Sequence, residues 1–129
     1  MNHFPSLEFT LGIVRKSTSL YVSVGGEFDY DTCDELVDAV TEHLSAGGAP
    51  LRDVRLGFGG LTHIDSSGLA ALLLIHRRVS ARGAALHLDD RPDFFERMLR
   101  ITNVLDHLTG PVGGEGARED EEAAPPERV

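Results

Sequence analysis

Residues 62–78 read THIDSSGLAALLLIHRR, and this stretch decides how the rest of the chain is arranged. It opens with the short polar residues Asp65, Ser66 and Ser67, which are preferred at helix starts because their side chains accept hydrogen bonds from unpaired backbone amides. The seven residues that follow Gly68 are all apolar, so they leave little polar face on a helix. The stretch therefore predicts a helix that begins at Ser66–Ser67 and packs deeply against a sheet.

Four other segments alternate apolar and polar residues, which is typical of strands with one face on a core. They are Leu7–Ile13, Leu20–Val24, Val54–Phe58 and Ala84–Leu88. The polar residues 16–19 predict a turn that joins the first two strands into a hairpin. The glycine pairs Gly25–Gly26 and Gly59–Gly60 are expected to end the second and third strands.

A second amphipathic helix is predicted between the second and third strands. Its apolar residues follow the spacing i, i+3, i+4, i+7 and i+11, which places them on one stripe: Cys33, Leu36, Val37, Val40 and Leu44. Thr32 with Glu35 three residues later predicts a capping box at its start. Gly47 and Gly48 are expected to close it.

The last predicted helices follow the fourth strand. Pro92 suits the first turn of a helix that carries Phe95, Met98 and Leu99. Asn103 accepts a left-handed backbone and is expected to kink the chain before a short final helix, Val104–Leu108.

The order of these elements predicts an α/β fold in which β-α-β units place helices against a mixed sheet of four or five strands. With 129 residues, the chain is long enough for one domain, which we assign to residues 1–109. Residues 110–129 consist mostly of Gly, Pro, Ala and acidic residues, so we expect an acidic, disordered C-terminal tail.

Composition narrows the classes of function. The formal net charge is −9, which argues against nonspecific nucleic-acid binding, because that binding needs a basic surface. No apolar run approaches the ~20 residues that span a bilayer, and the N-terminus lacks the pattern of a signal peptide, so we expect a cytoplasmic protein without a membrane span. The single cysteine, Cys33, cannot form an internal disulfide, and the six histidines show no metal-ligand spacing. No cofactor or metal is therefore predicted.

Ser66 has two interpretations on physical grounds. A phosphate on a serine at a helix N-terminus is tolerated by the free amides and by the helix dipole, so Ser66 is a candidate phosphoryl acceptor. The simpler alternative is that Asp65, Ser66 and Ser67 only cap the helix. The residues alone leave both open.

Three landmarks in order give the chain a family resemblance. They are GEFD at residues 26–29, IDSSGL at residues 64–69 and RMLRITNVLDHL at residues 97–108. With them, the chain resembles the STAS domain family, specifically the bacterial anti-sigma factor antagonists. The resemblance extends over residues 7–109 and implies a single STAS-like domain.

The resemblance also implies a regulatory function without catalysis. In this family the unphosphorylated antagonist binds an anti-sigma factor that is also a serine kinase, and so releases the sigma factor. The kinase phosphorylates the first serine of the motif, here Ser66, and a PP2C-type phosphatase reverses the modification. By position, the resemblance implies that the partner-binding residues are Glu27, Asp29, Asp65, Ser66, Ser67, Gly68 and Leu69. It places Glu27 and Asp29 in an upstream loop, while Ser67 is expected to act as a helix cap.

Two alternatives stay open. The first is a STAS scaffold or transporter-associated subunit whose serines serve only as caps. The second is a small enzyme or nucleotide-binding protein, against which the spacing argues: Gly57 and Gly59 begin a GxGxxG pattern, but Thr62 stands in place of its third glycine.

Overall fold

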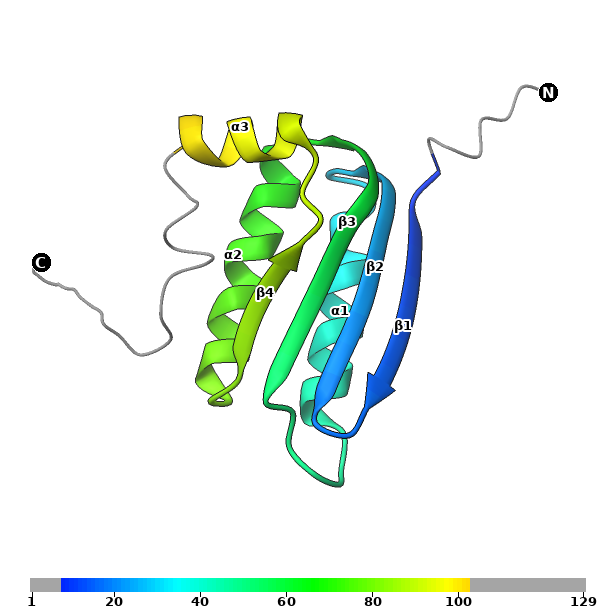
Figure 1. Ribbon diagram of the computed structural model, residues 1–129, viewed down its shortest axis with the longest axis vertical. Helices are drawn as coiled ribbons and strands as arrows, with labels where there is room; N and C mark the ends of the chain where they lie inside the picture. Colours follow the sequence, from blue (N-terminus) through cyan, green and yellow to red (C-terminus); the bar gives the residue numbers. More distant parts are fainter. Residues whose placement is uncertain (1–7, 103–129) are drawn as a thin grey trace, which may run out of the picture.

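The computed structural model describes residues 8–102 of the chain. The kink predicted at Asn103, the helix predicted over Val104–Leu108 and the acidic segment 110–129 lie outside these residues. Within them, four strands and three helices follow one another in the order β1, β2, α1, β3, α2, β4, α3 (Figure 1). This order confirms the predicted α/β fold.

The four strands form one mixed sheet in the spatial order β1-β2-β3-β4. Strand β1 (Thr10–Lys16) pairs antiparallel with β2 (Ser19–Phe28), which confirms the predicted hairpin. Strands β3 (Asp53–Ile64) and β4 (Ala85–Asp89) continue the sheet, each parallel to its neighbour. The parallel pairs bring the carboxyl ends of β2 and β3 to the same edge.

The helices lie on one face of the sheet and at its end (Figure 1). Helix α1 (Cys33–Ser45) connects β2 to β3, and α2 (Ser66–Ala81) connects β3 to β4. The shorter α3 (Asp93–Ile101) crosses the end of the sheet where α2 begins. Phe95 of α3 is fully buried, and its ring meets Phe58 of β3 edge to face, with 4.9 Å between the ring centroids.

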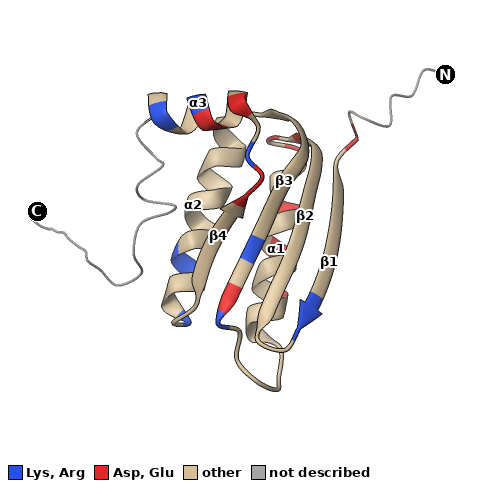
Figure 2. Cartoon of the chain, viewed as in Figure 1, with Lys and Arg blue, Asp and Glu red and all other residues tan. Residues whose placement is uncertain are grey.

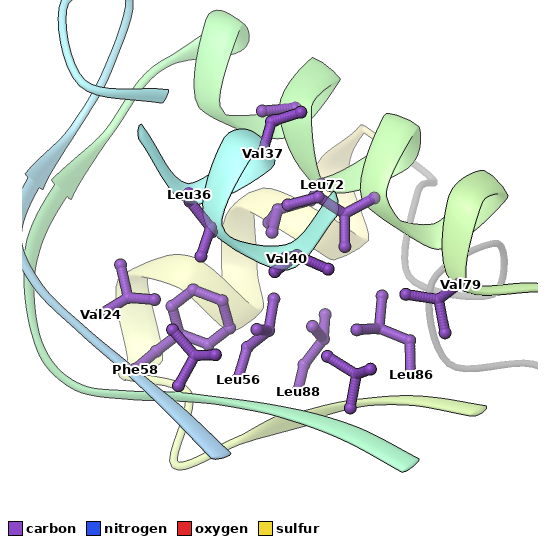
Figure 3. Close-up of a cluster of buried hydrophobic side chains, with 14 of the residues drawn as sticks. Val24, Leu36, Val37, Val40, Leu56, Phe58, Leu72, Val79, Leu86 and Leu88 are labelled. Carbon is purple, nitrogen blue, oxygen red and sulfur yellow. The ribbon is translucent and has the colours of Figure 1, made fainter. Parts of the chain in front are cut away.

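A single apolar core lies between the sheet and the helices (Figure 3). Strands β2, β3 and β4 contribute the alternating residues that the sequence predicted, and α1 contributes its predicted stripe, except that Cys33 is only half-buried. The prediction for the first strand is wrong at Ile13, which is 39% exposed, while Phe9 and Leu11 are only partly buried against the core. Labelled members of this core are Val24, Leu36, Val37, Val40, Leu56, Phe58, Leu72, Val79, Leu86 and Leu88. The opposite face of the sheet carries polar residues in ion pairs, including Arg55 with Asp89 at 2.9 Å.

Two strands are longer than predicted. Strand β2 runs through Gly25 and Gly26 to Phe28, and β3 runs past Gly59 and Gly60. These glycines do not end the strands. At Gly26 the reason is a close backbone approach: an ideal Cβ would lie 1.8 Å from the carbonyl oxygen of Glu8, and its φ is +81°. The pairing of β2 with β3 shifts register on either side of this residue, so the irregularity is absorbed within the strand.

The predicted capping box at α1 is wrong. Thr32 occupies the N-cap position, but its side chain makes no cap hydrogen bond. Its hydroxyl instead donates to the carbonyl oxygen of Glu27 at 2.8 Å and accepts from the backbone amide of Asp29 at 2.9 Å. Thr32 therefore fastens the turn between β2 and α1, and Glu35 stays exposed.

Candidate functional site

Asp65 joins two segments that lie far apart in the sequence. As the N-cap of α2, its Oδ1 accepts a hydrogen bond from the backbone amide of Gly68 at 3.0 Å. Its Oδ2 accepts from the backbone amide of Tyr30, in the turn between β2 and α1, at 3.2 Å. One carboxylate thus brings the GEFD and IDSSGL stretches together at the edge where β2 and β3 end.

Ser66 is the first residue of α2 and is exposed. Its hydroxyl forms no hydrogen bond with the part of the chain that the structure describes. The first amides of a helix have no intrahelical acceptor and are positively polarised, so this position favours an anion. Ser67 is half-buried one residue further on. The expectation that Ser67 caps the helix is wrong, because the cap is Asp65.

Gly68 and Leu69 shape the site from inside. An ideal Cβ on Gly68 would lie 2.6 Å from the carbonyl oxygen of Phe28 and 2.8 Å from a side-chain carbon of Ile64. Leu69 is 8% exposed and belongs to the core. Both residues position Ser66 and leave little surface of their own for a partner.

The two acidic residues of the GEFD stretch occupy different elements. Glu27 is half-buried within β2, opposite His63 of β3, so its placement in a loop was wrong. Asp29 does lie in the turn, where its Oδ1 accepts from the backbone amide of Asp31 at 3.0 Å. The structure therefore brings Asp29 and Asp65 to the same edge.

A groove of about 550 Å³ runs beside this edge, between the first turns of α1 and α2. Its walls combine apolar side chains with two carboxylates, and they are formed by Tyr30, Asp31, Cys33, Asp34, Val37, Ser67, Ala70, Ala71 and Leu74. Tyr30 is 78% exposed at its rim. Sequence reasoning missed Tyr30, although an aromatic residue within an acidic turn is a signal for an exposed contact.

Cys33, which lines the groove, is not a reactive thiol. Burial, followed by the carboxylates of Asp34 and Asp65, raises the pKa of Cys33 above its ordinary value. The thiol therefore stays protonated at neutral pH, where it is a weak nucleophile.

Metal ligation and membrane insertion find no support in the described part of the chain. Among residues 8–102, no group of three or more His, Cys, Asp or Glu side chains is arranged to hold a metal ion. None of the helices in this range is long and apolar enough to cross a membrane.

Comparison with known protein families shows which family this chain belongs to. The family model described as "Mlab, STAS domain" matches residues 11–110. The chain belongs to the STAS domain family. The resemblance drawn from the sequence is thereby confirmed at the level of the family. No curated protein matches the chain significantly in sequence.

Solved structures share the STAS fold with this chain. The anti-sigma factor antagonist SpoIIAA in its unphosphorylated form superposes with a TM-score of 0.63 and 18% identity, over 75% of this chain and 82% of that one. A sulfate transporter family protein from Wolinella succinogenes gives a TM-score of 0.60 and 19% identity, over 74% and 75%. Mglu in its native form gives 0.53 and 21%, over 62% of this chain but only 23% of that chain. At these identities the likeness concerns the fold alone.

Proposed function

We propose that this STAS domain is an anti-sigma factor antagonist, a non-enzymatic binding module switched off by phosphorylation of Ser66. In its unphosphorylated form it binds an anti-sigma factor with serine kinase activity in the cytoplasm, and thereby regulates sigma-factor-dependent transcription. A PP2C-type phosphatase resets the switch. The partner-binding surface comprises Asp29, Tyr30, Asp65, Ser66 and Ser67, with Glu27, Gly68 and Leu69 supporting it.

One observation carries the proposal: Ser66 is exposed as the first residue of α2, beside the groove. Asp65 satisfies the capping requirement alone, so Ser66 is not needed as the cap. SpoIIAA, whose fold the chain shares, is described in an unphosphorylated and a phosphorylated form. These facts support modification at Ser66 here.

The chemistry is a phosphoryl transfer in which the protein is the substrate. The Ser66 oxygen attacks the γ-phosphorus of ATP, the hydroxyl proton leaves to a kinase base, and ADP departs with the β-phosphate oxygen. The product carries a charge of about −1.5 to −2 at neutral pH. The free amides at the start of α2 stabilise that charge, so we expect the helix to stay folded.

The switch acts on the surface beside Ser66. Apolar side chains such as Val37 and Leu74 give the groove a surface that a partner can bury. Asp31 and Asp34 already make the groove acidic, and Asp65 adjoins Ser66. A phosphate there adds negative charge beside Asp65, so it repels an acidic partner surface and makes burial against an apolar one unfavourable.

Kinase assays with point variants test the assignment. We expect candidate anti-sigma kinases with ATP to phosphorylate the wild type and Ser67→Ala, but not Ser66→Ala. Ser66→Asp should weaken the complex with the kinase at least tenfold, because it places a permanent charge beside the groove. Mass spectrometry maps the phosphate and calorimetry measures the affinity.

The variants control for one another. Ser67→Ala removes the adjacent hydroxyl, so a loss of phosphate in this variant alone would assign the acceptor to Ser67. Ser66→Asp should unfold at the same temperature as the wild type, within a few degrees, because the residue is exposed. Phosphate found only at other residues would contradict the proposal.

The structural likeness to a sulfate transporter family protein favours a second candidate, a transporter-associated STAS subunit without a switch. In that case Ser66→Ala would leave partner binding unchanged, and protein purified from its host would carry no phosphate. An affinity pull-down from host membranes with the wild type and Ser66→Asp separates the two functions, since only the first predicts that the variant loses its partner.

A further inference from the structure

Besides those on α3, Lys and Arg residues lie at the end of the molecule opposite the start of α2 (Figure 2). We call this surface the basic end, and it consists of Arg15, Lys16, Arg52, Arg78 and Arg82. The sheet register places Lys16 next to Ser19 and Ser19 next to Asp53, so the end of β1 and the start of β3 lie at one edge. The last turns of α2 reach the same edge.

Backbone contacts hold part of this end together. The amide of Arg52 donates to the carbonyl oxygen of Thr18 at 2.8 Å, and the amide of Ala85 donates to the carbonyl oxygen of Arg52 at 2.9 Å. Arg52 and Arg82 line one shallow hollow of about 390 Å³. Both arginines therefore border a surface hollow that can accept acidic side chains.

None of these five cations pairs with a carboxylate within residues 8–102. Arg78 donates to the hydroxyl of Thr41 at 2.8 Å, and Arg82 donates to the hydroxyl of Ser45 at 3.4 Å. Arg15 donates to backbone carbonyl oxygens, including that of Ala49. Asp53 at the same edge is engaged by His87 at 2.9 Å, and Glu42 is the other acidic residue on the last turns of α1. Most of the positive charge is thus unneutralised.

The chain itself supplies a matching acidic segment, C-terminal to residues 11–110, which the STAS family model matches. Residues 115–127 contain six acidic residues and one arginine: Glu115, Glu119, Asp120, Glu121, Glu122, Glu127 and Arg118. Of the twelve residues between Thr102 and Glu115, the five of the predicted helix Val104–Leu108 span about 7 Å and the other seven up to about 24 Å, or roughly 31 Å together. The basic end lies about one length of α2 away from α3, or roughly 24 Å. The acidic segment can therefore reach it.

We propose that the acidic segment 115–127 docks on the basic end of its own chain. Tethering sets an effective concentration in the millimolar range, so weak ion pairs at exposed arginines are enough to populate the docked form. Because the pairs are exposed, the docking falls with salt. It occupies the end opposite Ser66 and is independent of the proposed switch.

Paramagnetic relaxation in the full chain tests this docking. A nitroxide is attached through Val129→Cys after Cys33→Ala has removed the native thiol. At low salt we expect the amide signals of Thr18, Arg52 and Gly83 to lose at least half their intensity, while those of Tyr30 and Asp65 keep theirs. In about 1 M salt, where the Debye length is about 3 Å, the loss should disappear.

Matched charge variants assign the contact. Arg52→Gln with Arg82→Gln should abolish the relaxation, whereas Arg97→Gln with Arg100→Gln, which removes two exposed charges from α3, should leave it unchanged. The acidic segment is neutralised by Glu119→Gln, Asp120→Asn, Glu121→Gln and Glu122→Gln. These substitutions should also abolish the relaxation, as the substitutions of Arg52 and Arg82 do.

Three outcomes would overturn the inference. One is relaxation that is equal at both ends of the molecule, and another is relaxation unaffected by the Arg52 and Arg82 variants. The third comes from mixing spin-labelled chains with isotope-labelled chains that lack the nitroxide: the same pattern in the second species would show that the segment binds another copy.

Discussion

At the residue scale, neighbouring residues of the DSSGL sequence have different structural roles at the start of α2. Asp65 caps α2 and holds the β2–α1 turn through Tyr30. Ser66 is left exposed, and Leu69 enters the core. Gly68 lets the first turn of α2 come close to the end of β2. The Ser66 hydroxyl is therefore presented by residues that each satisfy a separate structural requirement.

The close approach at Gly68 makes a stability prediction. We expect Gly68→Ala to destabilise the fold by about 1–3 kcal/mol, because its Cβ would overlap the carbonyl oxygen of Phe28 and the side chain of Ile64. Gly47→Ala is the matched control, since nothing lies within 4 Å of its ideal Cβ. Urea unfolding midpoints compare the two variants. Equal midpoints would contradict the close-packed helix start.

At the element scale, α3 is anchored in the core by two fully buried side chains, Phe95 and Leu99. Phe95 is fully buried, whereas Ile101 at the end of α3 is 76% exposed. The edge-to-face contact with Phe58 fixes α3 over the end of the sheet near the start of α2. The helix therefore closes the core at the end that carries the site.

Truncating Phe95 measures how much the packing of α3 contributes to the free energy of unfolding. We expect Phe95→Ala to lower the free energy of unfolding by about 3–5 kcal/mol, because it removes a buried ring and leaves a cavity beside Phe58. Phe95→Leu retains much of the apolar volume and should cost clearly less. Thermal unfolding followed by circular dichroism provides the comparison. Similar losses for both variants would argue against cavity formation as the cause.

At the scale of the whole molecule, the two ends differ in charge. The end with Ser66 carries Asp29, Asp31 and Asp65 together with the mixed charges of α3, and the opposite one is the basic end (Figure 2). Such an arrangement orients charged partners during encounter, with an effect that falls as salt rises. The proposed switch and the proposed docking surface therefore use different residues.

The domain boundary gives a prediction at this scale. We expect a chain of residues 1–109 to match the full chain in unfolding free energy within about 0.5 kcal/mol in 1 M salt, which screens tail docking. The reason is that residues 110–129 offer only Val112 and Val129 as strongly apolar side chains. Urea titrations of both chains measure it. A larger loss would mean that the C-terminal residues belong to the folded unit.

The sequence by itself determined the elements, their order and the place of Ser66, because local periodicity and helix-start preferences act over a few residues. The Ala84–Leu88 pattern and the start of α2 at Ser66 are confirmed on this basis. Only the tertiary structure decided that β2 continues through Gly26, since the reason is its close approach to Glu8, and that β3 continues through Gly60, which pairs with Gly25 of β2. It also decided that Asp65 binds the amide of Tyr30, 35 residues away, and that Thr32 fastens a turn instead of forming a capping box. These contacts depend on how the chain folds back on itself, and no local pattern encodes that.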